Sequence, residues 1–311
     1  MRRWIALGTT LIVLLTAAGA SAASLQEVLD DPDRDEIQPS YADGYLVWTD
    51  LRRRGAHSFV KADGGTRVRL NDAGTDSVAA VIDGTTVAFQ EFGPDGQIRF
   101  YDVVSETNTP TPDGINTRAW EDDPALSGDW LMFLRTNIDL VGPQDAYMRV
   151  YLVNTDTAER RKLLDVPYRR YYVATDQVNG DWATFETCRT PGRSFTDCQV
   201  FLYRISTETL TEVANPGLQQ YAGAVTSDGT VYLMRTGTSD EWRCGQNARI
   251  VRMPVGGPAE VIHEFPDGQD ALTTFAFEEG GGSVTLYLSR IRCERGAEGI
   301  YRITNADGAT P

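Results

Sequence analysis

The stretch "ADGYLVWTD", residues 42–50, joins a turn containing glycine to a short apolar run that ends on Thr49 and Asp50. A continuous apolar run of this length, bounded by turn residues, is typical of a buried strand. The fold depends on whether the chain repeats it. The pattern returns five times, as "IDGTTVAFQ" (82–90), "LSGDWLMFL" (126–134), "VNGDWATFE" (178–186), "TSDGTVYLM" (226–234) and "GGGSVTLYL" (280–288).

The copies keep a regular period. The marker glycines are 40, 44, 52, 49 and 53 residues apart: Gly44, Gly84, Gly128, Gly180, Gly229 and Gly282. A second apolar strand follows each of them after a gap, most copies add a third, and a short run precedes each glycine. Four short strands in 40–50 residues is the period of propeller blades. The sequence therefore predicts an all-β, six-bladed β-propeller with four-stranded blades.

We expect a single propeller domain over residues 23–311, because no linker separates the copies. The blades are predicted at approximately 37–71, 76–112, 118–166, 171–215, 220–265 and 270–311. The last copy lacks a fourth strand, whereas "SLQEVL", residues 24–29, precedes the first copy. Pairing this segment with the last blade would close the ring and cover an exposed edge. In the alternative, the acidic region "DDPDRDEIQ" and everything before it form a disordered leader.

The N-terminus has the three parts of a secretory signal peptide, predicted at residues 1–22. Arg2 and Arg3 precede an apolar segment, which ends at an Ala-Ser-Ala cleavage signature, residues 20–22. No later apolar stretch approaches the ~20 residues of a membrane span. We therefore expect an exported, extracytoplasmic, soluble protein without a membrane span, acting as a monomer. A formal net charge of −15 argues against nucleic acid as a partner.

Several copies resemble the TolB-like propeller repeat, in which a Ser-Pro-Asp-Gly turn precedes an apolar strand and a later strand ends in Asp before a Thr-Gly turn. The resemblance is clearest in residues 81–108 and 126–164, and "GYLVWTD" is also similar to the YWTD repeat. It covers nearly the whole mature chain. It implies the propeller fold, and a function as a rigid binding platform.

Four cysteines in an exported chain predict disulfide bonds. Three connectivities exist for Cys188, Cys198, Cys244 and Cys293. Cys188 and Cys198 bracket one loop of the fourth copy, whereas Cys244 and Cys293 occupy equivalent loops of neighbouring copies. These positions favour the pairs Cys188–Cys198 and Cys244–Cys293.

The loops between the second and third strands are long in copies three to six and share one face of the disk with the connections between blades. We call this the loop face. Long loops on a rigid scaffold are where binding is usually placed. Arginine suits carboxylates and phosphates, and aromatic rings suit sugars and peptides. The predicted binding residues are Arg52, Arg53, Arg54, Tyr171, Tyr172, Arg189, Arg193, Phe195, Trp242, Arg243, Arg292 and Arg295.

The expected ligand is a protein or an anionic glycan of the cell envelope. In the alternative, these arginines pair with acidic residues of the same face, and such surface pairs contribute little stability. The acidic residues concerned are Asp113, Asp122, Asp267, Asp270 and Glu294.

Enzymatic activity is the runner-up interpretation. His57 and His263 belong to different copies, so they are not expected to share a metal or a nucleophile. Aspartates near the ring centre, Asp76, Asp122 and Asp176, could instead support lyase or hydrolase chemistry at the channel mouth. A raised pKa on one of them, beside a second carboxylate, would favour this interpretation.

No cofactor is predicted. The acidic runs at residues 30–36 and 121–123 offer the oxygen ligands that Ca²⁺ takes, but neither has EF-hand spacing. Such runs are more often solvated loops.

Overall fold

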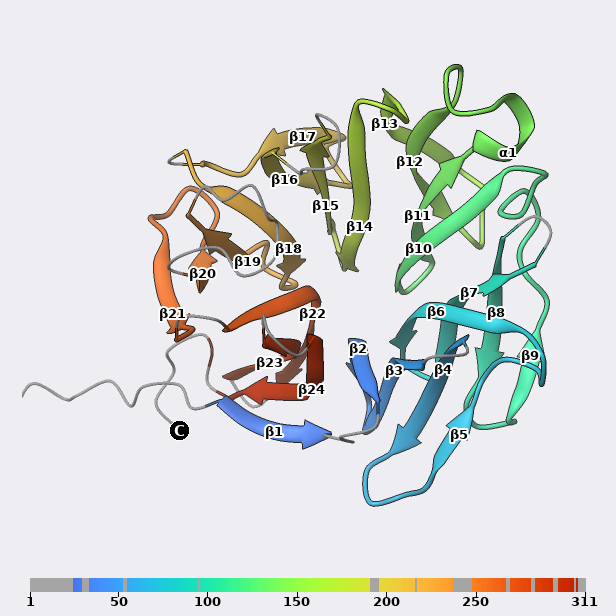
Figure 1. The fold of residues 1–311 in the computed structure, drawn as a ribbon, viewed down its shortest axis with the longest axis horizontal. Coiled ribbons are helices and arrows are strands. Elements are labelled where there is room, and N and C mark those ends of the chain that lie inside the picture. The colour runs from blue at the N-terminus through green and yellow to red at the C-terminus, as the bar shows by residue number, and fades with distance from the viewer. Residues whose placement is uncertain are drawn as a thin grey trace, which may run out of the picture.

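The computed structural model describes residues 25–29, 34–52, 55–93, 96–190, 196–215, 217–237, 248–266, 269–280, 283–292, 296–304 and 306. The predicted signal peptide lies outside them. The described chain forms six four-stranded antiparallel sheets around a ring, the predicted six-bladed β-propeller (Figure 1). Among these residues, no helix has the length and apolarity needed to cross a membrane.

The first three sheets follow chain order from the ring centre outward. Sheet one contains β2 (Asp35–Ala42), β3 (Tyr45–Arg52), β4 (Gly55–Ala62) and β5 (Arg67–Arg69). Sheet two contains β6 (Asp76–Asp83), β7 (Thr86–Phe92), β8 (Gln97–Asp102) and β9 (Thr107–Thr109). Sheet three contains β10 (Trp120–Ser127), β11 (Trp130–Thr136), β12 (Tyr147–Asn154) and β13 (Arg160–Pro167), with the single turn α1 (Ile138–Val141) between β11 and β12.

The other three sheets complete the ring. Sheet four contains β14 (Tyr171–Asn179), β15 (Trp182–Arg189), β16 (Thr196–Arg204) and β17 (Thr209–Glu212). Sheet five contains β18 (Gln219–Val225), β19 (Val231–Thr236), β20 (Arg249–Met253) and β21 (Glu260–Glu264). Sheet six contains β22 (Gln269–Gly280), β23 (Ser283–Arg292), β24 (Gly296–Ile303) and β1 (Leu25–Leu29).

Position in the blade explains the two hydrophobic patterns of the sequence. The second strands β11 and β19 are buried on both faces, since neighbouring blades cover them, and they read as continuous apolar runs. The third strand β8 alternates instead, with Ile98 and Phe100 buried and Arg99 exposed. The five marker glycines among the described residues lie in the hairpin turns after the inner strands, where Gly128 (φ 54°) and Gly180 (φ 56°) adopt the left-handed conformation that favours glycine.

The hydrophobic core is divided among the blade interfaces. One cluster joins Val47 of β3 to Phe89 of β7, and the next joins Ala88 of β7 to Phe133 of β11. The same kind of cluster lies at the remaining interfaces. Trp48, Phe89 and Phe133 are fully buried, and Trp130 and Trp182 are packed against clusters at the blade interfaces. These aromatic residues therefore serve packing between blades, as expected from their position in the repeat.

Side chains of the inner strands connect sheets one to five, each to the next. A polar side chain on one inner strand accepts a hydrogen bond from a backbone amide at the next: Ser40 from Ile82 (3.1 Å), Asp83 from Gly128 (2.7 Å), Ser127 from Gly180 (3.3 Å) and Gln177 from Val225 (2.9 Å). All six inner strands also contain a bulge where their pairing with the second strand shifts.

The N-terminal strand closes the ring, as predicted. β1 runs antiparallel to β24, with Leu25 opposite Ile303 and Leu29 opposite Ile300. Val28 and Leu29 pack against the cluster that joins sheets six and one, which contains Trp48 and Tyr287. Figure 1 shows β1 crossing the outer edge of the last blade, beside the first. The segment is therefore a blade strand rather than a leader.

Candidate functional site

The structure describes only part of the predicted binding surface. Arg53, Arg54, Arg193, Phe195, Trp242, Arg243 and Arg295 lie outside the described residues, as do Cys244 and Cys293. Arg52 and Arg292 are the last residues of β3 and β23. Tyr171, Tyr172 and Arg189 are fully described, and they lie together at one end of sheet four. The surface as a whole and the pair Cys244–Cys293 remain predictions.

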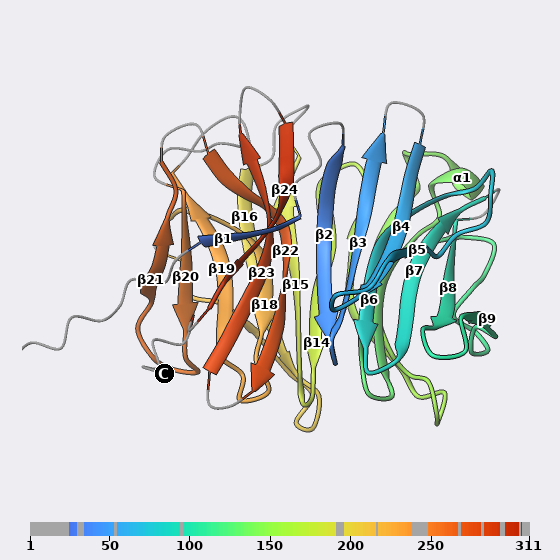
Figure 2. The same ribbon diagram turned by 90° about the horizontal axis from the view of Figure 1, so that it is seen from below.

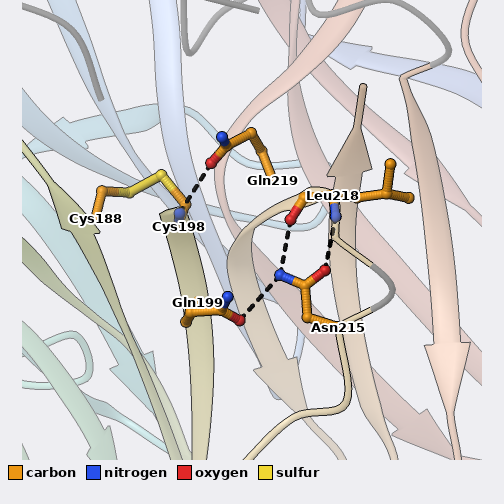
Figure 3. The surroundings of a disulfide bond; sticks show 6 residues. All are labelled: Cys188, Cys198, Gln199, Asn215, Leu218 and Gln219. Carbon is orange, nitrogen blue, oxygen red and sulfur yellow. Dashed lines mark hydrogen bonds between the residues drawn. A yellow bond between two sulfur atoms is a disulfide. The ribbon is translucent and has the colours of Figure 1, made fainter. Parts of the chain in front are cut away.

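The first predicted disulfide is present, because Cys188 and Cys198 are bonded. Both residues are buried. The Cys198 amide donates to Gln219 of sheet five (2.8 Å), and Asn215 donates to Gln199 (3.0 Å) and to the Leu218 carbonyl (2.7 Å) (Figure 3). The disulfide thus joins the end of β15 to the start of β16, and hydrogen bonds connect β16 to the next blade.

Basic and aromatic residues surround this disulfide. Tyr171 lies opposite Arg189, and Tyr172 lies opposite Cys188. Arg169 and Arg170 immediately precede β14 and are exposed. Their carbonyls accept hydrogen bonds from Thr190, which fixes this connection against β15. We call Arg169, Arg170, Tyr171 and Arg189 the blade-four patch.

One arginine of this patch has an acidic neighbour, although not one of those named in the predicted alternative of internal pairing. Arg189 lies 3.8 Å from Asp197 Oδ2, and both side chains are about two-thirds exposed. An exposed pair at this distance contributes little stability. Arg189 therefore stays accessible to an anionic ligand that binds it more tightly than Asp197 does. No ion pair of Arg169 or Arg170 is present among the described residues.

The centre of the ring contains a cavity of ≈ 390 Å³. It is lined by the second halves of four inner strands, β2, β6, β10 and β14, together with Glu279 of β22. These halves run from the bulges to the hairpin turns, so the cavity occupies the part of the channel that lies away from the loop face. Figure 2 shows the inner strands crossing the full thickness of the disk. Sequence analysis did not predict this cavity.

Carboxyl groups gather at the bulges of β10 and β14. Burial raises the pKa of Asp122 to about 6, although the Asp123 amide donates to its Oδ1 (2.8 Å). Burial, together with the charges of Asp122 and Glu186, raises the pKa of Asp123 well above its ordinary value. Burial and the charges of Glu186 and Asp123 do the same for Asp176, where the Gly223 amide works in the opposite direction.

Tyr172 belongs to the same cluster. Burial raises the pKa of its hydroxyl well above the ordinary value, and the charges of four carboxyls add to this, those of Asp122, Asp123, Asp176 and Glu186. A phenol that stays protonated can donate a hydrogen bond to a neighbouring carboxylate. The predicted binding residue Tyr172 thus lies between the blade-four patch and the channel carboxyls.

Two of the three aspartates proposed from sequence for acid–base chemistry, Asp122 and Asp176, come together here. Asp76 does not, because it is exposed at the start of β6 and does not line the cavity. Sequence reasoning missed Glu186, and it named Asp123 only within the acidic run 121–123 and not for acid–base chemistry. The repeat offered a signal for Asp123, because Asp123 and Asp176 occupy similar places in their copies, five and four residues before the marker glycine.

The remaining candidate ligands have structural partners or lie apart. Glu121 is buried and accepts from Arg135 Nε (2.7 Å) and from Thr117. His57 lies in β4, where it is half-buried and its Nδ1 is 3.4 Å from Asn71 Nδ2. His263 lies in β21. Within the described residues, no group of three or more His, Cys, Asp or Glu side chains could hold a metal ion.

Comparison with known proteins supports the fold alone. No protein-family model matches the sequence, and no curated protein matches it. Similar solved structures include a gluconolactonase from Xanthomonas campestris, with TM-score 0.56 and 16% identity over 91% of this chain and 90% of that one. An oligogalacturonate lyase in complex with manganese gives TM-score 0.54 and 11% identity over 88% and 83%. An alpha-L-arabinanase from Penicillium chrysogenum gives 0.54 and 11% over 93% and 100%.

Proposed function

We propose that this chain is an exported, monomeric, TolB-like propeller that recognises a protein or an anionic glycan through its loop face. The observation that carries the proposal is the blade-four patch. It presents three exposed arginines beside Tyr171 in a protein whose net charge is −15. The disulfide Cys188–Cys198 is also consistent with export, since disulfides persist in oxidising compartments.

The patch has the chemistry and the rigidity that such recognition needs. Arginine forks bind carboxylates through paired hydrogen bonds, and a tyrosine ring adds a surface for a sugar or a peptide. The disulfide and the hydrogen bonds of Thr190 hold the surrounding backbone before the ligand arrives. A preorganised surface loses less entropy on binding, which favours affinity.

The test measures binding of two defined anions, polygalacturonate and polyglutamate, by biolayer interferometry at low and high salt. We expect binding to at least one of them that weakens in high salt, because salt screens exposed charges. Arg170→Glu should abolish it. Lys61→Glu on β4 makes the same change of charge outside the patch and should retain it. Equal binding by both variants, or no binding by the wild type, would contradict the proposal.

The second candidate is a propeller enzyme that uses carboxylates at the channel mouth. The observation that favours it is the adjacent pair Asp122 and Asp123: burial raises the pKa of Asp122 to about 6, and burial with the charges of Asp122 and Glu186 also raises the pKa of Asp123. Two carboxyls with displaced pKa values are the arrangement that general acid–base catalysis uses. The similar lyase, lactonase and arabinanase structures support the scaffold and not a particular reaction, because they share at most 16% identity with this chain.

Its test incubates the protein with an oligogalacturonate, an aldonolactone and an arabinan oligosaccharide, followed by mass spectrometry of the products. Turnover that Asp122→Asn reduces by about 10²-fold or more would support this candidate. Turnover that the substitution leaves unchanged would exclude Asp122 as the acid or base.

A further inference from the structure

The channel cavity differs from the blade-four patch in the sign of its charge. Its described lining contains five acidic residues and no arginine, lysine or histidine. Two of the five already have partners: Asp83 accepts from the Gly128 amide (2.7 Å), and Glu279 accepts from Asn179 (2.7 Å) and Ser227 (2.6 Å). A third, Asp43, lies in the hairpin turn between β2 and β3. The remaining two, Asp123 and Asp176, lie at the end of the cavity that the bulges form.

Asp176 is the group that points to a ligand. Its side chain lines the cavity and the residue is only 6% exposed. Its Oδ2 is buried and makes no hydrogen bond with any described residue. A buried carboxylate oxygen without a donor is costly, and a bound molecule that donates a hydrogen bond to it would remove that cost. A cationic donor would form the strongest such bond.

The lining also restricts the kind of cation. A quaternary ammonium is usually held by several aromatic faces. Here the only aromatic residue among the described lining residues is Tyr41, whose ring is stacked on Tyr287 with centroids 4.7 Å apart. A metal ion is not favoured either, because the described residues contain no suitable ligand group. The remaining cation is one that donates hydrogen bonds, a primary ammonium.

The cavity volume sets the size of the molecule. A space of ≈ 390 Å³ lies within the range of small-molecule sites, which is roughly 300–1,000 Å³. Beyond the two carboxyls, the lining offers polar side chains such as Ser40, Ser127 and Asn179. These groups suit a compact molecule that carries hydroxyl or further amino groups.

We propose that the channel cavity binds a small organic molecule through a primary ammonium group that contacts the carboxyls of Asp123 and Asp176. The site is separate from the loop face and does not depend on the function proposed above. A linear diamine and an amino sugar share the required chemistry, so the experiment distinguishes them.

Isothermal titration calorimetry of the full mature chain tests the proposal with 1,4-diaminobutane and glucosamine. N-Acetylglucosamine lacks the ammonium group and should not bind. Asp176→Asn should weaken binding of the active amine by roughly tenfold or more, since it replaces a charge-assisted hydrogen bond by a neutral one. Asp129→Asn makes the same substitution at an exposed turn position and should bind like the wild type. Asp123→Asn serves as the second variant if Asp176→Asn does not fold.

Each outcome has a defined meaning. Binding of only one amine supports the site and identifies its ligand class as a diamine or an amino sugar. Binding of neither amine overturns the proposal, and so does binding that neither aspartate variant weakens. Calcium binding that both aspartate variants abolish, without binding of either amine, also overturns it in favour of a metal site. Arg170→Glu should leave amine binding unchanged, which separates this result from failure of the loop-face proposal.

Discussion

At the residue scale, the carboxyls at the bulges of β10 and β14 have pKa values that folding raises above their ordinary value. Asp122, Asp123 and Asp176 lose water on folding and lie near one another or near Glu186. Their charged forms are therefore disfavoured relative to the unfolded chain. These buried carboxyls lower the stability of the folded protein. A site that binds a cation would nevertheless require them, because they supply its negative charge.

The pKa of Asp122 predicts how stability varies with pH. Its ordinary value of 3.8 rises to about 6 in the folded protein. Stability from this group is fully present below pH 3.8 and is lost as pH rises through 6, because the folded state binds the proton more tightly. Asp122→Asn removes this loss. Thermal unfolding should show the variant about 1–2 kcal/mol more stable than the wild type at pH 7.5, with the difference much smaller at pH 4. A constant difference would contradict the raised pKa.

Gly223 gives a second prediction at this scale. A Cβ added there would lie 2.5 Å from Val200 Cγ1 and 3.1 Å from Asp176 Oδ2. Val200 is buried in the core and cannot move freely. Gly223→Ala should therefore destabilise the protein by about 1–3 kcal/mol. Gly93→Ala, whose Cβ would meet nothing within 4 Å, should cost much less in the same denaturant titration. Equal effects would show that the packing beside Asp176 is loose.

At the scale of elements, the second strands and their loops have different roles. The second strands form the buried walls between blades, whereas the loops that follow them carry the predicted recognition residues. Sheet four links the two roles directly, because Cys188 is the penultimate residue of β15 and Cys198 lies near the start of β16.

The disulfide should stabilise this hairpin by restricting the unfolded chain. Its cysteines are 10 residues apart. Cys188→Ala combined with Cys198→Ala should lower the free energy of unfolding by about 2–3 kcal/mol in a denaturant titration. If the loop face binds an anion as proposed, the same variant should also bind it more weakly, because the blade-four patch would be less ordered. An unchanged midpoint would show that packing alone holds the hairpin.

At the scale of the whole molecule, closure of the ring depends on β1. This strand contains the first described residues of the chain and pairs with its last strand, β24. Native-state hydrogen exchange should find β1 as protected as β24, with which it pairs. Leu29→Asp should reduce protection in both strands, because Leu29 packs in the interface with sheet one. Glu27→Asp, at an exposed position of the same strand, should leave protection unchanged. Exchange of β1 at the rate of a free peptide in the wild type would contradict closure.

The sequence by itself determined the architecture. The regular spacing of Gly44 to Gly282 predicted six blades, and the missing strand of the last copy predicted closure by residues 24–29. Position within the repeat also paired Cys188 with Cys198. These features are local or periodic, because five of the blades are built from consecutive strands and the sixth is completed by β1. A linear pattern is enough to identify them.

Only the tertiary structure decided which side chains meet at the axis. Asp122 and Asp123 come from one blade and Asp176 and Glu186 from the next, and their proximity arises where separate inner strands converge. Each inner strand also contains a bulge, which shifts the alternation of side chains and hides from the sequence which residue faces the channel. Burial, which raises the pKa values of these carboxyls, exists only once all six blades surround them.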